Sequence, residues 1–148
     1  MRSGAWQWLG SESGNTPKER DKNGMSEVYP WGRQWPPTKG AGNFADAAAK
    51  KAGSGFRYID GYDDGYAYTS PVGVFSASKD GVYDLSGNVW EWCEDWYNPT
   101  EKGYQVLRGG SWSDFDSASL RSSFRFLGHP AYRFDSYGFR CVLVVSGG

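Results

Sequence analysis

Apolar and polar residues alternate over only short stretches of this chain, and irregular segments separate those stretches. Val89 to Trp92 alternates directly after the turn signal Gly87-Asn88, which predicts a strand. Gln105 to Leu107 predicts a second strand. Phe139 to Val145 is largely apolar, as expected of a strand that is buried on both faces. The pattern therefore predicts a few short strands and a large share of loop.

One segment predicts a helix, and two further segments predict loop. Ala45 to Ala52 consists mostly of good helix formers, and Gly53 can end the helix. Because this segment is short and weakly amphipathic, we expect it at the surface. Residues 10–27 are polar and rich in Gly and Ser, which is typical of a loop, and Tyr29 to Gly32 predicts a tight aromatic turn.

The composition narrows the class of protein. The chain has 148 residues, a length that fits one domain with a sizeable core. Aromatic residues make up 18% of the chain and Gly numbers 21, which predicts many turns around a compact core and excludes a disordered chain or a helical bundle. The formal net charge of -1 supplies no basic surface for nucleic acid. We therefore expect one domain over residues 1–148 that does not bind nucleic acid.

The cysteines and the chain ends bear on the compartment. Cys93 and Cys141 form no Cys-x-x-Cys motif, so neither a disulfide framework nor a cysteine-based zinc site is expected, and one disulfide or two buried thiols stay open. The start of the chain lacks the apolar core of a signal peptide, and no apolar run is long enough to span a membrane. The expected location is the cytoplasm or a surface reached through a partner.

Two groups of carboxylates each allow a structural and a functional interpretation. Asp60 to Tyr66 places three carboxylates among glycines, which suits either a calcium loop or a solvated turn. The turn is favoured from this stretch alone, because the spacing is not that of an EF-hand. Asp84, Glu91, Glu94 and Asp95 suggest paired carboxylates for acid/base chemistry. The favoured interpretation is that Glu91 is a buried hydrogen-bond acceptor or a metal ligand.

His129 is the single histidine of the chain, so a Ser-His-Asp or Cys-His mechanism would have to use it. It stands beside Pro130 in a segment without a strand or helix pattern. A contact residue in a loop is therefore the favoured interpretation.

The segment from Ser113 to Tyr137, called the window below, has an unusual composition. Its 25 residues contain no Lys, Glu, Gln, Asn, Met or Trp, whereas the other 123 residues contain 31 residues of these types. At that density about six would be expected in the window. Large aromatic residues lie instead among Asp, Ser, Gly and His, a mixture that binding surfaces use.

Five motifs occur in a fixed order along the chain: Tyr29-Pro-Trp-Gly32, Thr69-Ser-Pro-Val-Gly73, Gly81-Val-Tyr-Asp-Leu-Ser-Gly-Asn-Val-Trp-Glu-Trp92, Leu107-Arg-Gly-Gly-Ser-Trp112 and Gly138-Phe-Arg-Cys-Val142. With them the chain resembles the formylglycine-generating enzyme family, also called sulfatase-modifying factors. The resemblance implies an α+β protein with the C-type lectin fold of that family. Such a fold has a small twisted antiparallel sheet, one or two helices and much irregular loop.

The enzymatic activity is not expected to accompany the resemblance. In the enzymes, two copper-binding cysteines follow the Gly-Gly-Ser-aromatic motif, and the matching positions here are Asp114 and Ser119. Neither residue can form the thiolate that copper chemistry needs. Ergothioneine-pathway sulfoxide synthases share the fold but need a histidine-rich iron site, which one histidine cannot supply. We expect no copper and no enzyme activity.

The resemblance also implies structural Ca²⁺, held by two sets of oxygen ligands. The first set matches Asn43, Phe44, Asp64 and Tyr66. The second set matches Asp84, Gly87, Val89 and Glu91. Side-chain and carbonyl oxygens are the hard ligands that calcium takes.

A second resemblance concerns the window. Variable proteins of diversity-generating retroelements have this fold, and their variable region lies between Arg-Gly-Gly-Ser-Trp and Gly-Phe-Arg, as the window does here. In those systems, adenines of a template repeat are replaced at random during reverse transcription. Asn codons then become codons for residues such as Phe, Tyr, Ser, Asp, His, Gly and Leu. They cannot become codons for Lys, Glu, Gln, Met or Trp, because the third base is unchanged.

This resemblance divides the window into fixed and diversified positions. The fixed framework is expected at Arg121, Ser122, Ser123, Arg125, Pro130, Ala131 and Arg133. The diversified, ligand-binding positions are expected at Asp114, Phe115, Asp116, Phe124, Phe126, Leu127, Gly128, His129, Tyr132, Phe134, Asp135, Ser136 and Tyr137.

The leading hypothesis is a ligand-binding protein whose hypervariable surface displays these positions to one target, with a protein as the expected class of target. The alternative is a degenerate or truncated formylglycine-generating enzyme-like protein, or a partner subunit of such an enzyme. The display hypothesis predicts that several Phe side chains of the window face solvent. It also predicts that Arg121, Arg125 and Arg133 bind backbone carbonyls or carboxylates.

Overall fold

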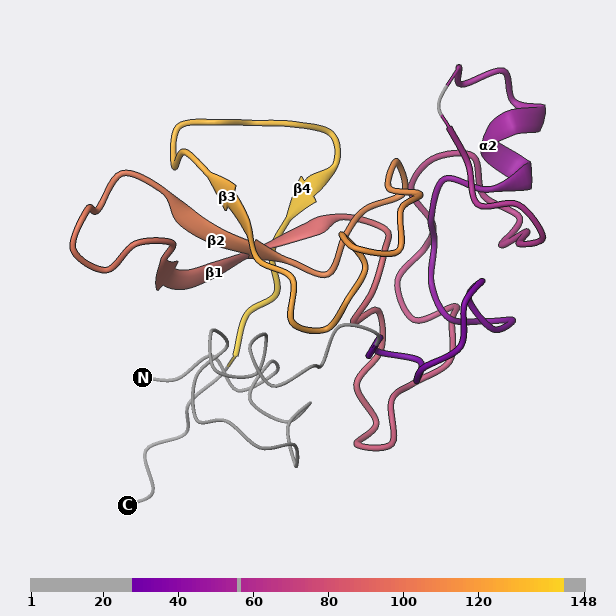
Figure 1. The fold of residues 1–148 in the computed structure, drawn as a ribbon, viewed down its shortest axis with the longest axis horizontal. Helices are drawn as coiled ribbons and strands as arrows, with labels where there is room; N and C mark the ends of the chain where they lie inside the picture. Colours follow the sequence, from indigo (N-terminus) through magenta and orange to yellow (C-terminus); the bar gives the residue numbers. More distant parts are fainter. Residues whose placement is uncertain (1–27, 56, 143–148) are drawn as a thin grey trace.

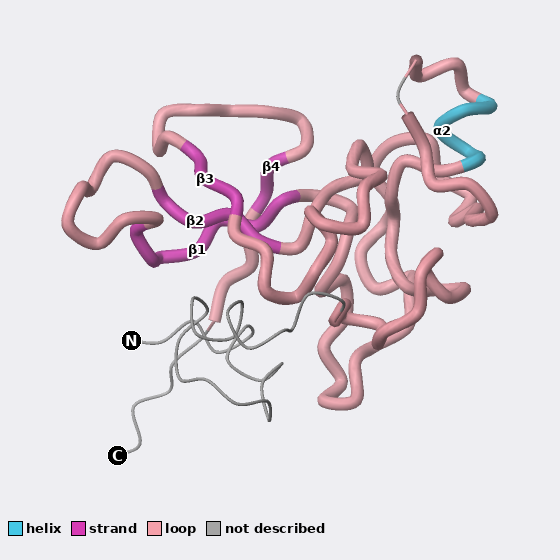
Figure 2. Tube along the Cα trace, viewed as in Figure 1, coloured by secondary structure: helices cyan, strands magenta, loops and turns pink. Residues whose placement is uncertain are grey.

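The computed structural model describes residues 28–55 and 57–142. Within these ranges the elements are α2, Ala47–Lys51; β1, Trp90–Trp96; β2, Gln105–Arg108; β3, Phe126–Gly128; and β4, Tyr137–Gly138. Loops make up most of the remaining chain (Figure 2). Figure 1 shows the strands on one side of the molecule and α2, with the loops that precede β1, on the other. The predicted loop over residues 10–27 lies outside the described residues.

The four strands form one sheet in the order β3-β2-β1-β4. β1 pairs antiparallel with β2, and β2 pairs antiparallel with β3, whereas β4 pairs parallel with β1. The sheet is therefore mixed, and the prediction of an antiparallel sheet is wrong for β4. The cause is the connection after β3, which crosses from one edge of the sheet to the other and returns the chain in the direction of β1 (Figure 1).

The first two predicted strands are confirmed by β1 and β2. The third, predicted from Phe139 to Val145, is wrong for residues 139–142, which are the part of it that the structure describes. β4 ends at Gly138, and the following Phe139 and Val142 are 75% and 63% exposed. Among the described residues, no strand pairs with the chain beyond Gly138. A run of apolar residues forms a strand only where a neighbour satisfies its N–H and C=O groups.

The predicted helix is confirmed as α2, and Asp46 is its N-cap residue. The Oδ1 atom of Asp46 accepts hydrogen bonds from the N–H groups of Ala48 and Ala49, at 2.8 and 3.4 Å. Ala49 is buried while Lys50 is exposed, so one face of this short helix packs inward. No helix within residues 28–55 and 57–142 is long and apolar enough to cross a membrane.

A hydrophobic cluster lies among the loops rather than on the sheet. Its buried members are Tyr29, Phe44, Ile59, Tyr62 and Leu120. Tyr29 stacks on Trp31 with ring centroids 4.7 Å apart, and Phe44 contacts Tyr62 at 5.8 Å. Leu120 belongs to the window, and Phe115 of the window packs against the cluster. The beginning of the window, residues 113–120, is therefore anchored in this cluster.

Two glycines allow the loops before β1 to pack backbone against backbone. A Cβ atom at Gly87 would lie 2.1 Å from the carbonyl oxygen of Asn43, and one at Gly42 would lie 2.2 Å from that of Ser86. Gly87 also has a φ of +77°, which a residue with a side chain rarely adopts. The N–H group of Asn88 donates to the Asn43 carbonyl at 2.8 Å. Residues 86–88, directly before β1, are thus packed backbone to backbone against residues 42–43, where the first predicted set of calcium ligands begins.

Candidate functional site

The middle of the window is held by Arg108, which lies in β2 outside the window. Its Nη1 atom donates to the carbonyl oxygens of Ser122, Ser123 and Phe124, at 3.2, 2.9 and 2.7 Å. All three acceptors are backbone atoms. These hydrogen bonds therefore do not depend on which side chains the window carries.

The first part of the window, residues 113–120, is packed into the molecule. The Oδ2 atom of Asp114 accepts hydrogen bonds from the N–H group and the hydroxyl of Ser111, at 2.9 and 2.6 Å. The carbonyl of Asp114 accepts from the N–H group of Ala45 at 3.0 Å. Burial raises the pKa of the Asp114 carboxyl group, and the side chain of Leu120 is buried. The predicted contact residue Asp114 therefore stabilises the fold.

Asp116 also stabilises the backbone of this part. Its Oδ1 atom accepts from the N–H groups of Ala118 and Ser119, at 2.9 and 3.2 Å. Its Oδ2 atom accepts from the Ser119 hydroxyl at 2.7 Å. Asp114 and Ser119, which occupy the positions of the copper-binding cysteines, are thus both engaged in hydrogen bonds, and neither is a soft ligand for copper.

The second part of the window, residues 126–135, presents most of its side chains to solvent over the sheet. The exposed positions among those expected to be diversified are Phe126, Leu127, His129, Tyr132, Phe134 and Asp135. Their rings follow one another in contact: the centroid distance is 5.4 Å from His129 to Tyr132, 5.8 Å from Tyr132 to Phe134 and 4.9 Å from Phe134 to Tyr137. We call the surface formed by these six residues and the adjoining ring of Tyr137 the aromatic face.

The four Phe side chains of the window divide evenly, and none of them is buried. Phe126 and Phe134 are 38% and 54% exposed. Phe115 is partly buried against the loop cluster, and the guanidinium of Arg57 lies 4.7 Å from its ring centroid. Phe124 is partly buried, with its ring 6.0 Å from that of Trp90. The prediction that several face solvent is confirmed for two of them.

Three further predicted positions do not fully face solvent. Gly128 is buried, and a Cβ atom there would lie 2.5 Å from the Trp92 ring and 2.8 Å from Leu107. A side chain at this position would require the sheet to shift, so the structure does not place Gly128 on the aromatic face. Ser136 and Tyr137 are partly buried beside β1: the Ser136 carbonyl accepts from the N–H group of Trp90 at 2.7 Å, and the Tyr137 ring lies 5.7 Å from that of Trp92.

Two of the three framework arginines bind the backbone as predicted. Arg125 donates to the carbonyl of Tyr97 at 3.0 Å, and its guanidinium lies 4.8 Å from the Tyr97 ring centroid. Arg133 donates to the carbonyls of Pro130 and Tyr132, at 2.9 and 2.8 Å. The prediction is wrong for the Nε atom of Arg121, which is buried without a hydrogen-bond partner among the described residues.

The sequence interpretation missed two aromatic residues that border the aromatic face from outside the window. Tyr104 is 44% exposed, and its ring centroid is 5.9 Å from that of His129. Trp92 lies 5.7 Å from Tyr137, with the rings perpendicular. Only the strand register could have revealed Tyr104, because the adjacent Gln105 pairs with Gly128 next to His129.

His129 and the cysteines have the geometry of contact or structural residues. The Nδ1 atom of His129 accepts a hydrogen bond from the N–H group of Ala131 at 3.2 Å. Cys93 and Cys141 are both free, which settles the pairing that the sequence left open. Burial raises the pKa of the Cys93 thiol to about 11, so this thiol is a poor nucleophile. Cys141 is exposed.

The first predicted calcium set has oxygens that suit a cation. The Oδ1 atom of Asn43 is buried without a hydrogen-bond partner among the described residues. The Asp64 carboxylate accepts from the N–H groups of Phe44 and Tyr66, each at 2.8 Å. Burial raises the pKa of Asp64 to about 7. A buried oxygen without a donor and a carboxylate that is costly to ionise are both features that a bound Ca²⁺ would stabilise.

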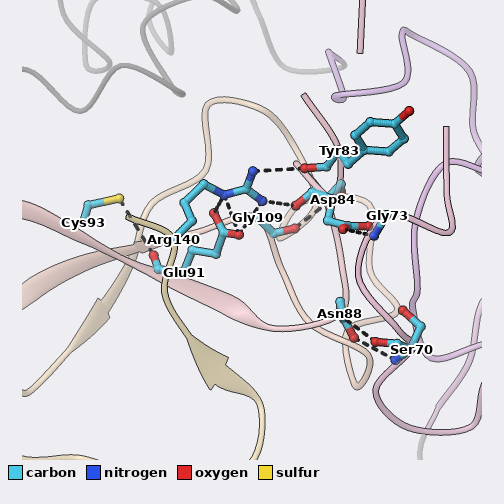
Figure 3. Close-up of polar contacts among 10 residues, drawn as sticks. Ser70, Gly73, Tyr83, Asp84, Asn88, Glu91, Cys93, Gly109 and Arg140 are labelled. Carbon is cyan, nitrogen blue, oxygen red and sulfur yellow. Dashed lines mark hydrogen bonds and ion pairs between the residues drawn. The ribbon is translucent and has the colours of Figure 1, made fainter. Parts of the chain in front are cut away.

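The second predicted calcium set is arranged differently, because Arg140 binds Glu91 (Figure 3). The Nε atom of Arg140 lies 2.8 Å from each carboxylate oxygen of Glu91. Its Nη2 atom donates to the carbonyl of Asp84 at 2.7 Å, and its Nη1 atom donates to that of Tyr83 at 3.0 Å. Burial raises the pKa of Glu91, an effect that Arg140 opposes. Glu91 is a buried acceptor, as one of its two favoured interpretations predicted, and the set suits a metal less well than the first.

Titratable side chains do not gather into a metal centre in the part of the chain that the structure describes. No cluster of three or more His, Cys, Asp or Glu side chains is placed to hold a metal ion within residues 28–55 and 57–142. Glu94 and Asp95, which suggested paired carboxylates, are exposed on β1.

Known proteins similar to this chain include one that is named an inactive enzyme and one that is named a formylglycine-generating enzyme. The inactive C-alpha-formylglycine-generating enzyme 2 of Bos taurus is 37% identical over 121 residues, which cover 78% of this chain and 37% of that protein. The formylglycine-generating enzyme of Streptomyces coelicolor is 32% identical over 103 residues, which cover 59% of this chain and 33% of that protein. The chain thus spans little more than a third of the length of these relatives.

A solved structure supports the fold. Treponema denticola variable protein 1 superposes with a TM-score of 0.51 and 22% identity, over 84% of this chain and 44% of that chain. At this identity the likeness concerns the fold alone, and it agrees with the predicted C-type lectin fold. The family model of the sulfatase-modifying factor enzyme 1-like domain matches residues 11–145. The chain therefore belongs to the family of sulfatase-modifying factor enzyme 1-like domains.

Proposed function

We propose that this chain is a ligand-binding display protein of the kind that diversity-generating retroelements vary, and that the aromatic face binds its target. The observation behind the proposal is that residues 126–135, inside the window, expose a continuous row of rings over the sheet. In an ordinary domain such large aromatic side chains are mostly buried. A contiguous exposed apolar patch of this kind marks a binding site.

The aromatic face is also preorganised. The N–H group of Tyr132 donates to the carbonyl of His129 at 2.9 Å, and Arg133 binds two carbonyls of the same turn. A rigid backbone that carries aromatic side chains, which have few rotatable bonds, loses little conformational entropy on binding. Tyr, Trp and Arg also dominate the binding energy of protein interfaces, which supports a protein as the class of target.

The scaffold has features that would tolerate variation at these positions. Arg108 donates to backbone carbonyls of the window, and Arg125 donates to the backbone carbonyl of Tyr97, which directly follows β1. Substitution of Tyr132 or Phe134 would leave those hydrogen bonds in place. A loop surface held by fixed backbone contacts can change its side chains without losing its shape.

The test of the variable-protein proposal is the DNA around the gene. We expect a near-copy of the codons for residues 113–137, with Asn codons at the diversified positions, beside a gene for a reverse transcriptase. Codons for fixed Ser122 and Arg125 should agree between the two copies and serve as the internal control. A genome with neither a near-copy nor a reverse transcriptase gene would contradict the proposal.

We also propose that the chain does not generate formylglycine. Asp114 and Ser119 occupy the positions of the copper-binding cysteines, and the Cys93 thiol is buried with a raised pKa. The relative from Bos taurus is itself named an inactive enzyme. Incubation with a sulfatase Cys peptide and Cu(I) should give no aldehyde above a control without protein. Turnover above that control would overturn this part.

A second candidate function is a degenerate family member that acts as a partner subunit of an active enzyme. The name of the Bos taurus relative favours it, because an inactive homologue can assist an active one. This candidate requires no variation of the window, so the codon comparison above distinguishes it from the display protein.

We further propose one structural Ca²⁺ at Asn43, Phe44, Asp64 and Tyr66. The unpartnered Oδ1 atom of Asn43 and the raised pKa of Asp64 support it. The ion would stabilise the loops that pack against the first part of the window, since Ala45 follows directly after Phe44 and donates to Asp114. Its role would be structural, at a distance from the aromatic face in the sequence.

A further inference from the structure

We infer that the guanidinium of Arg140 is the resident cation of the second oxygen set, and that this set therefore takes no calcium in this chain. The inference concerns the scaffold and is independent of the target. It separates the two sets that the sequence treated alike.

Arg140 binds the Glu91 carboxylate of the second set and two backbone carbonyls that lie beside that set. The Nε and Nη2 atoms bind the Glu91 carboxylate, which is the bidentate arrangement in which Arg and carboxylate pair best. The remaining donors reach the carbonyls of Tyr83 and Asp84. The planar donor fork thus satisfies one carboxylate and two carbonyls of the motif before β1 (Figure 3).

A calcium ion and this guanidinium would compete for Glu91. The Glu91 side chain is 10% exposed, so its charge needs a close partner. A metal ion at Glu91 would either lie beside the guanidinium, which brings two cations together, or displace the guanidinium, which leaves it without its carboxylate. Either arrangement is costly in a site of low dielectric constant.

What remains of the second set is a poor calcium site. The Oδ2 atom of Asp84 already accepts from the N–H group of Gly73 at 2.6 Å, so the buried and unpartnered Oδ1 atom is the one oxygen that this side chain leaves open to a cation. One carboxylate oxygen and the carbonyls of Gly87 and Val89 are only about half of the six to eight oxygens that calcium takes. The missing charge is the Glu91 carboxylate, which Arg140 holds.

The consequence is a clamp on the window that needs no metal. Arg140 follows β4 at the C-terminal end of the window, and Glu91 lies in β1, 49 residues earlier. The ion pair joins the end of the window to the constant motif before β1. Removal of calcium should therefore leave this end in place.

The test is the number of calcium ions bound by the whole chain, measured by native mass spectrometry with added Ca²⁺. We expect at most one ion on the wild type. Glu91→Gln should leave that number and the calcium Kd unchanged within about twofold, since a twofold change is only about 0.4 kcal/mol. Asp64→Asn should remove the ion and serves as the positive control for the first set.

Removal of the guanidinium gives the complementary arm. Arg140→Met keeps an unbranched stem and frees both Glu91 oxygens, so this variant should gain one calcium ion and show a calcium-dependent melting temperature. The double variant with Glu91→Gln should not gain it. An Arg140→Met chain that gains no ion would overturn the idea that the guanidinium keeps calcium out.

Two wild-type results would overturn the inference without any variant. One is a stoichiometry of two calcium ions, and the other is electron density for calcium between Asp84 and Glu91 in crystals grown with Ca²⁺. Loss of a wild-type ion in Glu91→Gln would do the same. If Asp64→Asn alone fails to lose the ion, calcium does not bind at the first set, and the assignment of Arg140 as the cation of the second set still stands.

Discussion

The two parts of the window differ in how exposed their side chains are, although both lack the same six residue types. In residues 113–120, Asp114 accepts hydrogen bonds from Ser111, and Leu120 is buried in the loop cluster. In residues 126–135, Tyr132 and Phe134 are more than half exposed. A window defined by composition therefore contains two classes of position. Some side chains stabilise the fold, and others are available for a target.

The comparison also shows what supports each part. The first part is bound to the loops before β1, because the N–H group of Ala45 donates a hydrogen bond to the carbonyl of Asp114. The second part lies on the sheet, with Phe126 ring to ring with Trp90 at 5.2 Å. A disturbance of the loops should therefore reach the first part and spare the second.

The largest effect is expected at Trp90, on which the second part rests. Trp90 is 5% exposed and contacts the rings of Phe124 and Phe126. Trp90→Ala should reduce the free energy of unfolding by about 3–5 kcal/mol, because it leaves a large cavity. Urea denaturation followed by circular dichroism measures this loss. A loss below about 1 kcal/mol would show that the sheet does not support the aromatic face in this way.

Calcium should separate the two parts through the first ligand set. At a hundredfold excess over Kd, a ligand of the folded state stabilises it by about 2.7 kcal/mol. Chelation should speed hydrogen exchange in residues 113–120 and leave residues 126–135 unchanged. Equal acceleration in both parts would break the comparison.

The calcium effect should also depend on pH. The pKa of Asp64 is raised to about 7 in the folded chain, against about 3.9 for an unfolded Asp. Without calcium, the stability that the protonated carboxyl contributes is present below about pH 4 and is lost as the pH rises through 7. Calcium binds the ionised form, so the gain in melting temperature should be larger at pH 8 than at pH 5.

Asp114 tests whether a predicted contact residue is structural. Asp114→Ala removes the acceptor for the N–H group and the hydroxyl of Ser111, and a buried polar group left without a partner costs about 1–3 kcal/mol. Asp135→Ala, an exposed Asp of the second part, is the matched control and should cost little. Equal stability of both variants would remove the distinction between the two parts.

The smallest effect on stability is expected on the aromatic face. Tyr132→Ala and Phe134→Ala should change the free energy of unfolding by no more than about 0.5 kcal/mol, as for other surface changes. Phe126→Ala should cost about 1 kcal/mol, because an aromatic pair with Trp90 is lost. Tyr83→Ala is the control, since its side chain is 49% exposed outside the window. Variants at Tyr132 or Phe134 that fail to fold would sink the display proposal.

Short-range features could be predicted well. The run of good helix formers over Ala45 to Ala52, with Gly53 after it, predicted α2, because helix propensity acts within one or two turns. The alternation after Gly87-Asn88 predicted β1 for the same reason. The N-cap role of Asp46 was seen only in the structure. The ordered motifs predicted the family and hence the fold, and the residues at 114 and 119 predicted the absence of copper cysteines.

Contacts between distant residues could not be predicted. The sequence marks Gly128 as one of many diversified positions, yet it is buried because β3 pairs with β2 beside Trp92. Tyr104 borders the aromatic face only because the register puts Gln105 opposite Gly128. Register depends on pairs of strands far apart in the chain, and no local pattern records it.

The sequence by itself determined the family, the short helix, the two central strands and a window suited to binding. Only the tertiary structure decided which window side chains face solvent, the direction of β4 and the partner of Glu91. The physical reason is the same in each case. Propensity and capping depend on neighbours within a few residues, whereas burial and ion pairing depend on what packs alongside, as with Arg140 and Glu91, 49 residues apart.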